Sequence, residues 1–535
     1  MLVGYVSDER YVALPDALLE FEAGNRRVEV RSSASGAVHA GIEPGRYRVT
    51  IARDGYGSKR VDVTVAEGRP FQFRLLADGL LGFAWPRCVR SGEKSEFRVH
   101  SSEPYKLELF RYGREKEFVR AIGWFDEHGP RATVQITPDG DYTRTGVRWN
   151  SIGYTSPNHR QYVTAPERSG LYYFHASTLN PFTGDASVPR AFFSFPWIVA
   201  PARPQARIAV LVSDVNWNAY NNFGGRSNYA NPAELPPVPT VNARQELPRY
   251  TDPDNVVYDR EEYAPLSFER PEPINHIPLS VGLHDPIEGR AACHVAETEW
   301  RILGWLEQEG FDCDVYSETQ LHHGLLTLDD YEVLLLGPHP EYWSEEMYYG
   351  VKGWVHERGG KLVYLGGNGL NCKVEITDRE TMKVFNGDAR EIARRGLESR
   401  FHYYCESEAN LLGVVYSDSG VMTAAPYEVV DAGHWIFAGT GLANGDLFGE
   451  RSLHMRIPGG ASGHETDKRS ASSPAGVAVA ARGLNPGGGG AEIVHYESRS
   501  GGEVFSAGSI CYASSLLVDE VVSAITANAL RRFLG

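Results

Sequence analysis

The chain has 535 residues, which is too long for one hydrophobic core and predicts about two to four domains. Hydrophobic residues make up 42% of it, and its 56 glycines and 31 prolines indicate many turns and much β-structure. The formal net charge of −16 argues against a nucleic-acid or anionic-membrane partner, because binding phosphate groups requires an excess of Lys and Arg.

The cysteine pattern and the N-terminus bear on the compartment. The six cysteines are scattered without a C-x-x-C pair, so neither a disulfide framework nor a cysteine zinc site is expected. The first residues, MLVGYVSDERYVALPD, contain neither the basic nor the apolar region of a signal peptide. Since no apolar run approaches the roughly 18 residues of a membrane helix, we expect a cytoplasmic protein.

Residues 1–78 predict a small β-sandwich. RRVEVRSSASG and GRYRVTIARDGYGSKRVDVTVAEG alternate apolar and polar residues between glycine-containing turns, as half-buried strands do. EPGRYRVTI followed by GYGSKRVDVTV resembles the prealbumin-like or carboxypeptidase-regulatory-like sandwich. The segment carries no catalytic cluster, so packing or spacing is its expected role.

Residues 79–203 predict a second β-sandwich with long insertions. The expected strands lie in EKSEFRVHSSEPYKLELFRYG, RATVQITPDG, SGLYYFHAST and RAFFSFPWIVAP. The proline-rich APARPQA marks the end of this domain.

Residues 204–535 predict a doubly wound α/β domain. RIAVLVSD, YEVLLLG and KLVYLGG are apolar runs of the kind that form buried parallel strands. An amphipathic helix closed by Gly310 and a second helix with Ser344 as its N-cap lie between them. Ligands bind at the carboxyl ends of such strands, and polar residues cluster there from Asp214, from His339 and from Gly366.

Several known site types do not fit these strand ends. LGGNG lacks the G-x-G-x-x-G spacing of a dinucleotide loop, and the chain has neither a G-x-S-x-G elbow nor an H-E-x-x-H helix. The sheet resembles that of class I glutamine amidotransferases, but His339-Pro340-Glu341 stands where their nucleophilic cysteine would be. The residues alone therefore predict a polar site at the strand ends but do not identify a reaction.

A more specific resemblance covers residues 205–535. NWNAYNNFGGRSNY, SFERP, GPHPEYWS, YLGGNG and GGEVFSAGSI together resemble the C-terminal domain of the large subunit of N,N-dimethylformamidase. That family is an amidohydrolase with a mononuclear ferric ion held by two tyrosine phenolates and one glutamate. The resemblance thus implies cleavage of a small amide, with a small partner subunit or a homo-oligomer.

Residue by residue, the resemblance implies Tyr220 and Glu341 as metal ligands. The second phenolate is expected just before SFERP, where Tyr263 is preferred because it is nearer that motif and Tyr258 is the alternative. The catalytic residues implied are His339 beside the metal, Asn368 facing the substrate, and Glu465.

The implied chemistry is metal-assisted amide hydrolysis. Fe(III) is a hard Lewis acid suited to oxygen ligands, and Glu465 or His339 would act as general base and acid while Asn368 donates to the developing oxyanion. Two alternatives remain open at this point. One is a non-catalytic binding or scaffold protein with an amidotransferase-like domain, and the other is a hydrolase that uses Glu341 and Glu465 as paired carboxylates.

Overall fold

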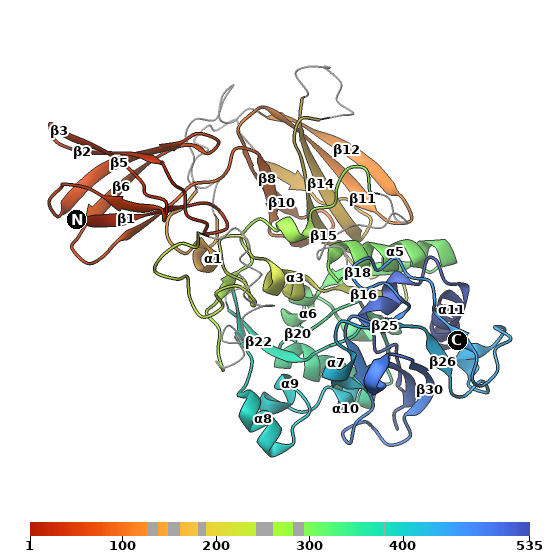
Figure 1. Cartoon of the computed structure of the whole chain (residues 1–535). Coiled ribbons are helices and arrows are strands. Elements are labelled where there is room, and N and C mark those ends of the chain that lie inside the picture. The colour runs from red at the N-terminus through yellow and green to blue at the C-terminus, as the bar shows by residue number, and fades with distance from the viewer. Residues whose placement is uncertain (126–136, 148–160, 180–188, 242–260, 282–293, 378–380) are drawn as a thin grey trace.

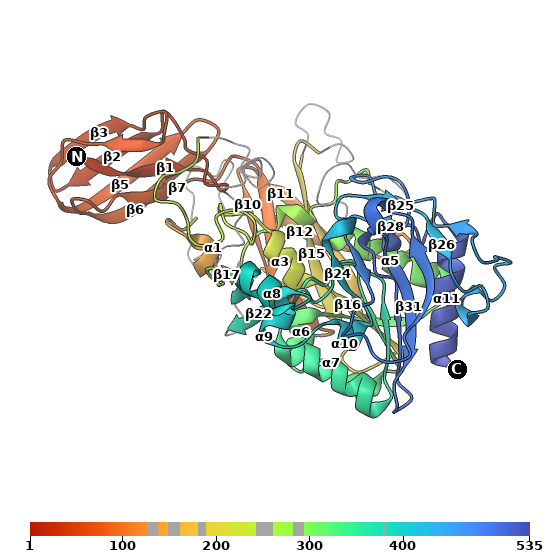
Figure 2. The same cartoon turned by 60° about the horizontal axis from the view of Figure 1, so that its bottom comes forward.

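The computed structural model describes residues 1–125, 137–147, 161–179, 189–241, 261–281, 294–377 and 381–535. In Figures 1 and 2 the first strands project away from the rest of the molecule, and the later elements form a larger body. The prediction of a β-rich chain is confirmed by the many separate sheets, which agree with β-sandwich domains. The likeness to glutamine amidotransferases stays a prediction.

The N-terminal residues form two small facing sheets with their own core. One cluster of buried side chains, from Val3 to Leu75, lies within the predicted first domain. One sheet has the order β4-β1-β7 and the other β3-β2-β5-β6. The strands are β1 (Leu2–Ser7), β2 (Leu18–Ala23), β3 (Arg26–Arg31), β4 (Ala37–His39), β5 (Gly45–Arg53), β6 (Gly57–Val65) and β7 (Phe71–Arg74).

A second pair of sheets follows, again with its own core, from Leu80 to Val199. The sheet orders are β13-β10-β8 and β12-β11-β14-β15-β9. The strands are β8 (Leu80–Trp85), β9 (Cys88–Arg90), β10 (Lys94–Ser101), β11 (Tyr105–Tyr112), β12 (Lys116–Phe125), β13 (Tyr162–Thr164), β14 (Gly170–Thr178) and β15 (Phe192–Ala200). Most of the expected strand RATVQITPDG, residues 131–136, lies outside the described residues. The domain boundaries at residues 78 and 203 stay predictions.

The C-terminal part is built on a nine-stranded sheet with the order β18-β16-β19-β21-β32-β31-β30-β26-β27. The strands from β18 to β32 run parallel, and those from β31 to β27 pair antiparallel. The sequence analysis did not predict this antiparallel half. The strands are β16 (Ile208–Val212), β18 (Cys313–Ser317), β19 (Val333–Leu336), β21 (Lys361–Tyr364), β26 (Tyr427–Val429), β27 (Leu447–Phe448), β30 (Ala478–Gly483), β31 (Glu492–Glu497) and β32 (Glu503–Ser506).

Both faces of the parallel strands are covered, which explains their continuous apolar runs. Alternate residues of β16 enter different cores: Val210 packs with helices α5 (Ala296–Glu309) and α11 (Glu520–Leu534), whereas Leu211 packs with α7 (Glu345–Arg358). Because successive side chains of a strand point to opposite faces, every residue of β16 and β19 is buried.

Shorter elements surround the carboxyl edge of these strands. A four-stranded sheet has the order β17-β23-β22-β20, and β24–β29 and β25–β28 are two-stranded pairs. The strands are β17 (Leu266–Ser267), β20 (Tyr342–Trp343), β22 (Cys372–Thr377), β23 (Thr381–Phe385), β24 (Val415–Ser417), β25 (Ala424–Ala425), β28 (Ser462–Gly463) and β29 (Thr466–Lys468). The remaining helices are α1 (Tyr142–Thr145), α3 (Asp214–Tyr220), α6 (Glu318–His322), α8 (Ala389–Arg395), α9 (Arg400–Tyr404) and α10 (Ala409–Leu412).

Helix length and composition bear on membrane insertion. Within the described ranges, no helix combines the length and the apolar character that crossing a bilayer requires.

Candidate functional site

Neighbouring parallel strands deliver the predicted site residues to one place. β16 leads into α3, which ends at Tyr220, and β19 leads into the segment with His339 and Glu341. β21 leads to Asn368, while Glu465 lies just before β29, and its carbonyl accepts the backbone N–H of Ile510 beyond β32. Since β16, β19, β21 and β32 are consecutive in the sheet, their carboxyl ends bring these residues together.

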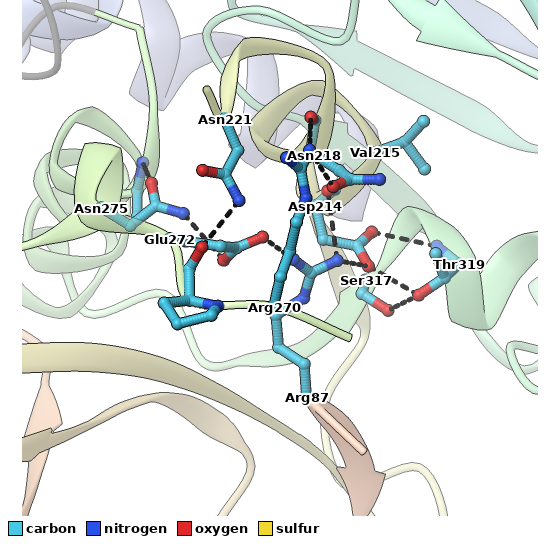
Figure 3. A network of polar contacts seen from close by, with 12 residues as sticks. Arg87, Asp214, Val215, Asn218, Asn221, Arg270, Glu272, Asn275, Ser317 and Thr319 are labelled. Carbon is cyan, nitrogen blue, oxygen red and sulfur yellow. Dashed lines mark hydrogen bonds and ion pairs between the residues drawn. The ribbon is translucent and has the colours of Figure 1, made fainter. Parts of the chain in front are cut away.

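A buried charge network fixes the start of α3 (Figure 3). Asp214, the first residue of α3, accepts hydrogen bonds from Arg87 Nη2 at 3.1 Å and from Thr319 Oγ1 at 2.6 Å. Arg87 also pairs with Glu272, so a guanidinium between the strands β8 and β9 of the second sandwich balances two buried carboxylates. The helix that carries Tyr220 is thereby held both to the second sandwich, through Arg87, and to α6, through Thr319.

A second arginine fixes the other end of α3. Arg270, in the SFERP motif, donates from Nη2 to the backbone oxygen of Asn218 at 3.1 Å and to its side-chain oxygen at 3.0 Å. Its Nη1 donates to the carbonyl of Phe223 at 2.7 Å. This motif therefore orders the loop after α3, and its arginine is buried because backbone oxygens satisfy its donors.

Two phenols and a carboxylate meet beside α3. The Tyr220 hydroxyl lies 3.1 Å from Oε2 of Glu341, and the Tyr229 hydroxyl lies 2.6 Å from the Tyr220 hydroxyl and 3.1 Å from the same carboxylate oxygen. Tyr229 also contacts the Tyr342 hydroxyl at 2.8 Å. Glu341 is only 2% exposed, whereas Tyr220 and Tyr229 are half-buried.

His339 lies against this group with a defined orientation. Its Nδ1 is 3.0 Å from the carbonyl of Gly367, which can only accept, so Nδ1 carries a proton. Its Nε2 lies 3.1 Å from Glu341 Oε2, 3.3 Å from the Tyr220 hydroxyl and 3.7 Å from Glu465 Oε2. The ring thus stands between two carboxylates.

The electrostatics of this pair favour the charged forms. Burial lowers the pKa of His339, but the hydrogen bond and charge of Glu341 outweigh it, so the pKa lies above its ordinary value. Burial likewise raises the pKa of Glu341, and the hydrogen bond and charge of His339 bring it below its ordinary value.

Asn368 and Glu465 form the opposite side of the site. Asn368 Nδ2 donates to Glu465 Oε2 at 2.9 Å, and the Asn368 backbone N–H donates to Asp467 Oδ1 at 2.7 Å. The φ of Asn368 is +51°, a left-handed conformation that Asn adopts more easily than most residues. Its buried Oδ1 has no hydrogen-bond partner among the described residues and is available to a bound molecule.

The structure thus brings together Tyr220, Glu341, His339, Asn368 and Glu465. Tyr263 lies in a neighbouring apolar cluster with Val215 and Tyr342, and its backbone N–H donates to the Val384 carbonyl. Tyr258 lies outside the described residues. The choice between these two tyrosines as ligand stays a prediction.

Tyr229 is the group that the sequence reasoning missed. It ends the Asn- and aromatic-rich segment SDVNWNAYNNFGGRSNY, and nothing in its spacing from Tyr220 distinguishes it from a loop tyrosine. Only the concentration of hydrogen-bonding residues in this segment could have pointed to Tyr229.

The donor set fits a hard cation. Among the described residues no group of three His, Cys, Asp or Glu side chains forms a metal site, so a cation here would depend on the tyrosine oxygens. Neighbouring oxygen ligands of a small cation lie about 3 Å apart, since each bond is about 2 Å long. The separations of 2.6–3.1 Å among the Tyr220, Tyr229 and Glu341 oxygens agree with that arrangement.

Comparison with known families places the chain. The model of the family described as N,N-dimethylformamidase beta subunit-like, C-terminal, matches residues 107–524, and the chain belongs to this family. The match begins in β11, well before residue 205, where the sequence motifs first indicated it.

One relative is the N,N-dimethylformamidase beta subunit of Paracoccus aminophilus, which is 26% identical over 284 residues. The alignment covers 44% of this chain and 36% of the relative, so the chain matches little more than a third of that protein's length.

The solved structures compared with the chain share little sequence and little structure with it. A putative carbohydrate binding protein from Bacteroides uniformis is 12% identical, with a TM-score of 0.14 over 36% of this chain and 96% of that chain. The Bacillus anthracis TIE protein is 15% identical, with a TM-score of 0.12 over 39% of this chain and 36% of that chain. TM-scores this low do not establish a shared fold.

Proposed function

We propose that the protein is a metal-dependent amidohydrolase that cleaves the C–N bond of a small N-alkyl amide or formamide. A mononuclear ferric ion would be held by Tyr220, Glu341 and a second tyrosine. The observation that carries the proposal is the meeting of the Tyr220 and Glu341 oxygens, 3.1 Å apart, beside His339 at the sheet edge.

The choice of Fe(III) follows from the ligands. Phenolate and carboxylate oxygens are hard donors, and a tyrosine hydroxyl, with its ordinary pKa near ~10, ionises at neutral pH only beside a strong cation. When bound, the ion would supply Lewis-acid polarisation of an amide carbonyl or a water molecule.

The protein's own residues would manage the protons. His339 Nε2 lies 3.1 Å from Glu341, close enough to exchange a proton with it, and 3.7 Å from Glu465, which is near but beyond hydrogen-bond distance. Glu465 or His339 would accept a proton from the attacking water and return one to the leaving amine. Asn368 holds Glu465 with one amide hydrogen and has a second for the developing oxyanion, a contribution of about 3 kcal/mol.

The second phenolate has three candidates. Tyr229 is favoured by the position of its hydroxyl, which lies 2.6 Å from that of Tyr220. The family resemblance favours Tyr263, with Tyr258 as the alternative. Separate Tyr→Phe variants at the three positions distinguish them, because loss of a phenolate ligand removes its contribution to the visible absorption.

The test measures metal and colour together with activity. The purified protein is expected to contain about one iron per chain, to absorb visible light through phenolate-to-iron charge transfer, and to hydrolyse a member of a panel of formamides and N-alkyl amides. Tyr220→Phe is expected to bleach the colour and abolish hydrolysis. Activity that survives in colourless, metal-free protein would contradict the proposal and favour the paired carboxylates, whereas protein without iron or activity would favour the scaffold alternative.

We also propose that the chain works with a small partner subunit or as a homo-oligomer. The relative from Paracoccus aminophilus is named a beta subunit, and that name supports a multisubunit state. Light scattering of the chain expressed alone tests self-association, and a monomeric, fully active preparation would contradict both arrangements.

A further inference from the structure

His294 is a buried imidazole beside the candidate site that the proposed chemistry leaves without a role. It lies two residues before α5 and is only 1% exposed. Neither Nδ1 nor Nε2 has a hydrogen-bond partner among the described residues. A buried polar atom without a hydrogen-bond partner destabilises the folded protein, so these two nitrogens need an explanation.

The ring is surrounded by residues of the site. Its centroid lies 4.6 Å from the ring of Tyr220 and 5.5 Å from that of His339, with interplanar angles of 69° and 89°. It therefore packs against both the proposed phenolate ligand and the proposed proton carrier, whose rings also contact each other at 5.8 Å. A molecule bound where Tyr220 and His339 meet would therefore lie close to the ring of His294.

A second pair of histidines supports this wall of the site. The ring of His464 lies 5.4 Å from that of His294, and the φ of His464 is +65°, a conformation uncommon for a non-glycine residue. His454 Nδ1 accepts the backbone N–H of Ile457, so His454 Nε2 carries the proton that it donates to His464 Nδ1 at 3.0 Å. His464 is thereby held in one orientation next to His294.

We propose that His294 contacts the substrate, donating a ring N–H to the carbonyl oxygen of the small amide. This inference rests on the proposed function, because it places the amide beside Tyr220 and His339. A neutral imidazole offers one donor and one acceptor, and the amide oxygen is the group that a buried donor needs. Asn368 would be one donor to the substrate oxygen, and His294 would be a second donor, placed beside Tyr220.

The experiment compares two apolar variants with a polar one. His294→Phe and His294→Leu remove both ring nitrogens, whereas His294→Gln keeps a donor. We expect the apolar variants to retain iron and the visible absorption but to lose at least about tenfold in kcat/KM, since that loss corresponds to about 1.4 kcal/mol. His294→Gln is expected to recover part of the loss, and His39→Phe, at an exposed position of β4, to have no effect.

A binding measurement supplies a readout apart from turnover. Titration calorimetry of the iron-loaded protein with N,N-dimethylacetamide is expected to give weaker binding for both apolar variants than for the wild type. Wild-type kcat/KM and affinity in the apolar variants would overturn the assignment, as would loss of iron from them, which would make His294 a structural support. Absence of iron and hydrolysis in the wild type would instead overturn the proposed function.

Discussion

Glu408 illustrates how burial controls the ionisation of single side chains in this protein. Its carboxyl is fully buried, accepts a hydrogen bond from Ser399 Oγ at 2.5 Å, and has a pKa raised by burial to about 8. In the unfolded chain the same group ionises near its ordinary value of 4.5. Between these values the unfolded chain releases a proton that the folded protein keeps, so the folded state loses stability as the pH rises.

Replacing Glu408 with Gln should remove this pH dependence. The variant is expected to gain stability relative to the wild type as the pH rises from about 5 to about 8, by up to roughly 1.4 kcal/mol per pH unit. Urea denaturation at several pH values measures the difference, with Glu357→Gln, at an exposed position of α7, as the control. A difference between variant and wild type that stays constant across this range would contradict the account.

Some residues of this site could be predicted from the sequence, and others could not. His339 and Glu341 could be predicted because they directly follow a buried apolar strand, where ligands of an α/β sheet collect. Tyr229 and His294 could not. Tyr229 reaches Glu341 across 112 residues of sequence, and His294 meets Tyr220 through ring contacts that depend on how loops fold over the sheet.

Among the elements, the loop after β21 packs closely against the segment that carries Glu465. A Cβ on Gly367 would lie 2.5 Å from the carbonyl oxygen of Glu465 and 2.7 Å from the backbone nitrogen of Ile510. The Gly367 carbonyl also accepts from His339 Nδ1. The absence of a side chain at Gly367 therefore lets the loop approach the segment that carries Glu465. The carbonyl of the same residue fixes the orientation of His339.

Gly367→Ala is expected to push Glu465 and His339 apart. Overpacking of this kind costs about 1–3 kcal/mol, and hydrolysis should fall at least about tenfold. Gly350→Ala is the matched control: Gly350 lies exposed within α7, and its Cβ would meet nothing within 4 Å. The control should gain up to about 1 kcal/mol in thermal unfolding without a change in rate, and wild-type hydrolysis by Gly367→Ala would refute this description of the loop.

The regular elements around the site were the part that sequence patterns predicted well. Gly310 ends α5 with a φ of 77°, and Ser344 caps α7 by accepting the backbone N–H of Met347, both as expected. The antiparallel strands β26, β27, β30 and β31 were missed. They are two to six residues long and separated by glycine-rich loops, so no sustained periodicity marks them.

At the scale of the whole molecule, buried arginines join the sandwiches to the rest of the chain. Arg74 of β7 donates to the carbonyls of Gly140 and Gly224, outside the first sandwich, and Arg87 pairs with Asp214 and Glu272. Sequence patterns predicted that the sandwiches exist but not these contacts, because each joins residues 66 to 185 positions apart. The second sandwich, through Arg87, thereby takes part in positioning α3.

Because Arg87 helps to position the helix that carries Tyr220 beside Glu341, we expect the oxygens of these two residues to share one ferric ion. A crystal of the protein as purified, measured on both sides of the iron absorption edge, tests it most directly. The account predicts one strong anomalous peak within bonding distance of the Tyr220 hydroxyl oxygen and the Glu341 carboxylate. A peak that contacts neither residue, or no iron peak from protein that hydrolyses amides, would contradict it.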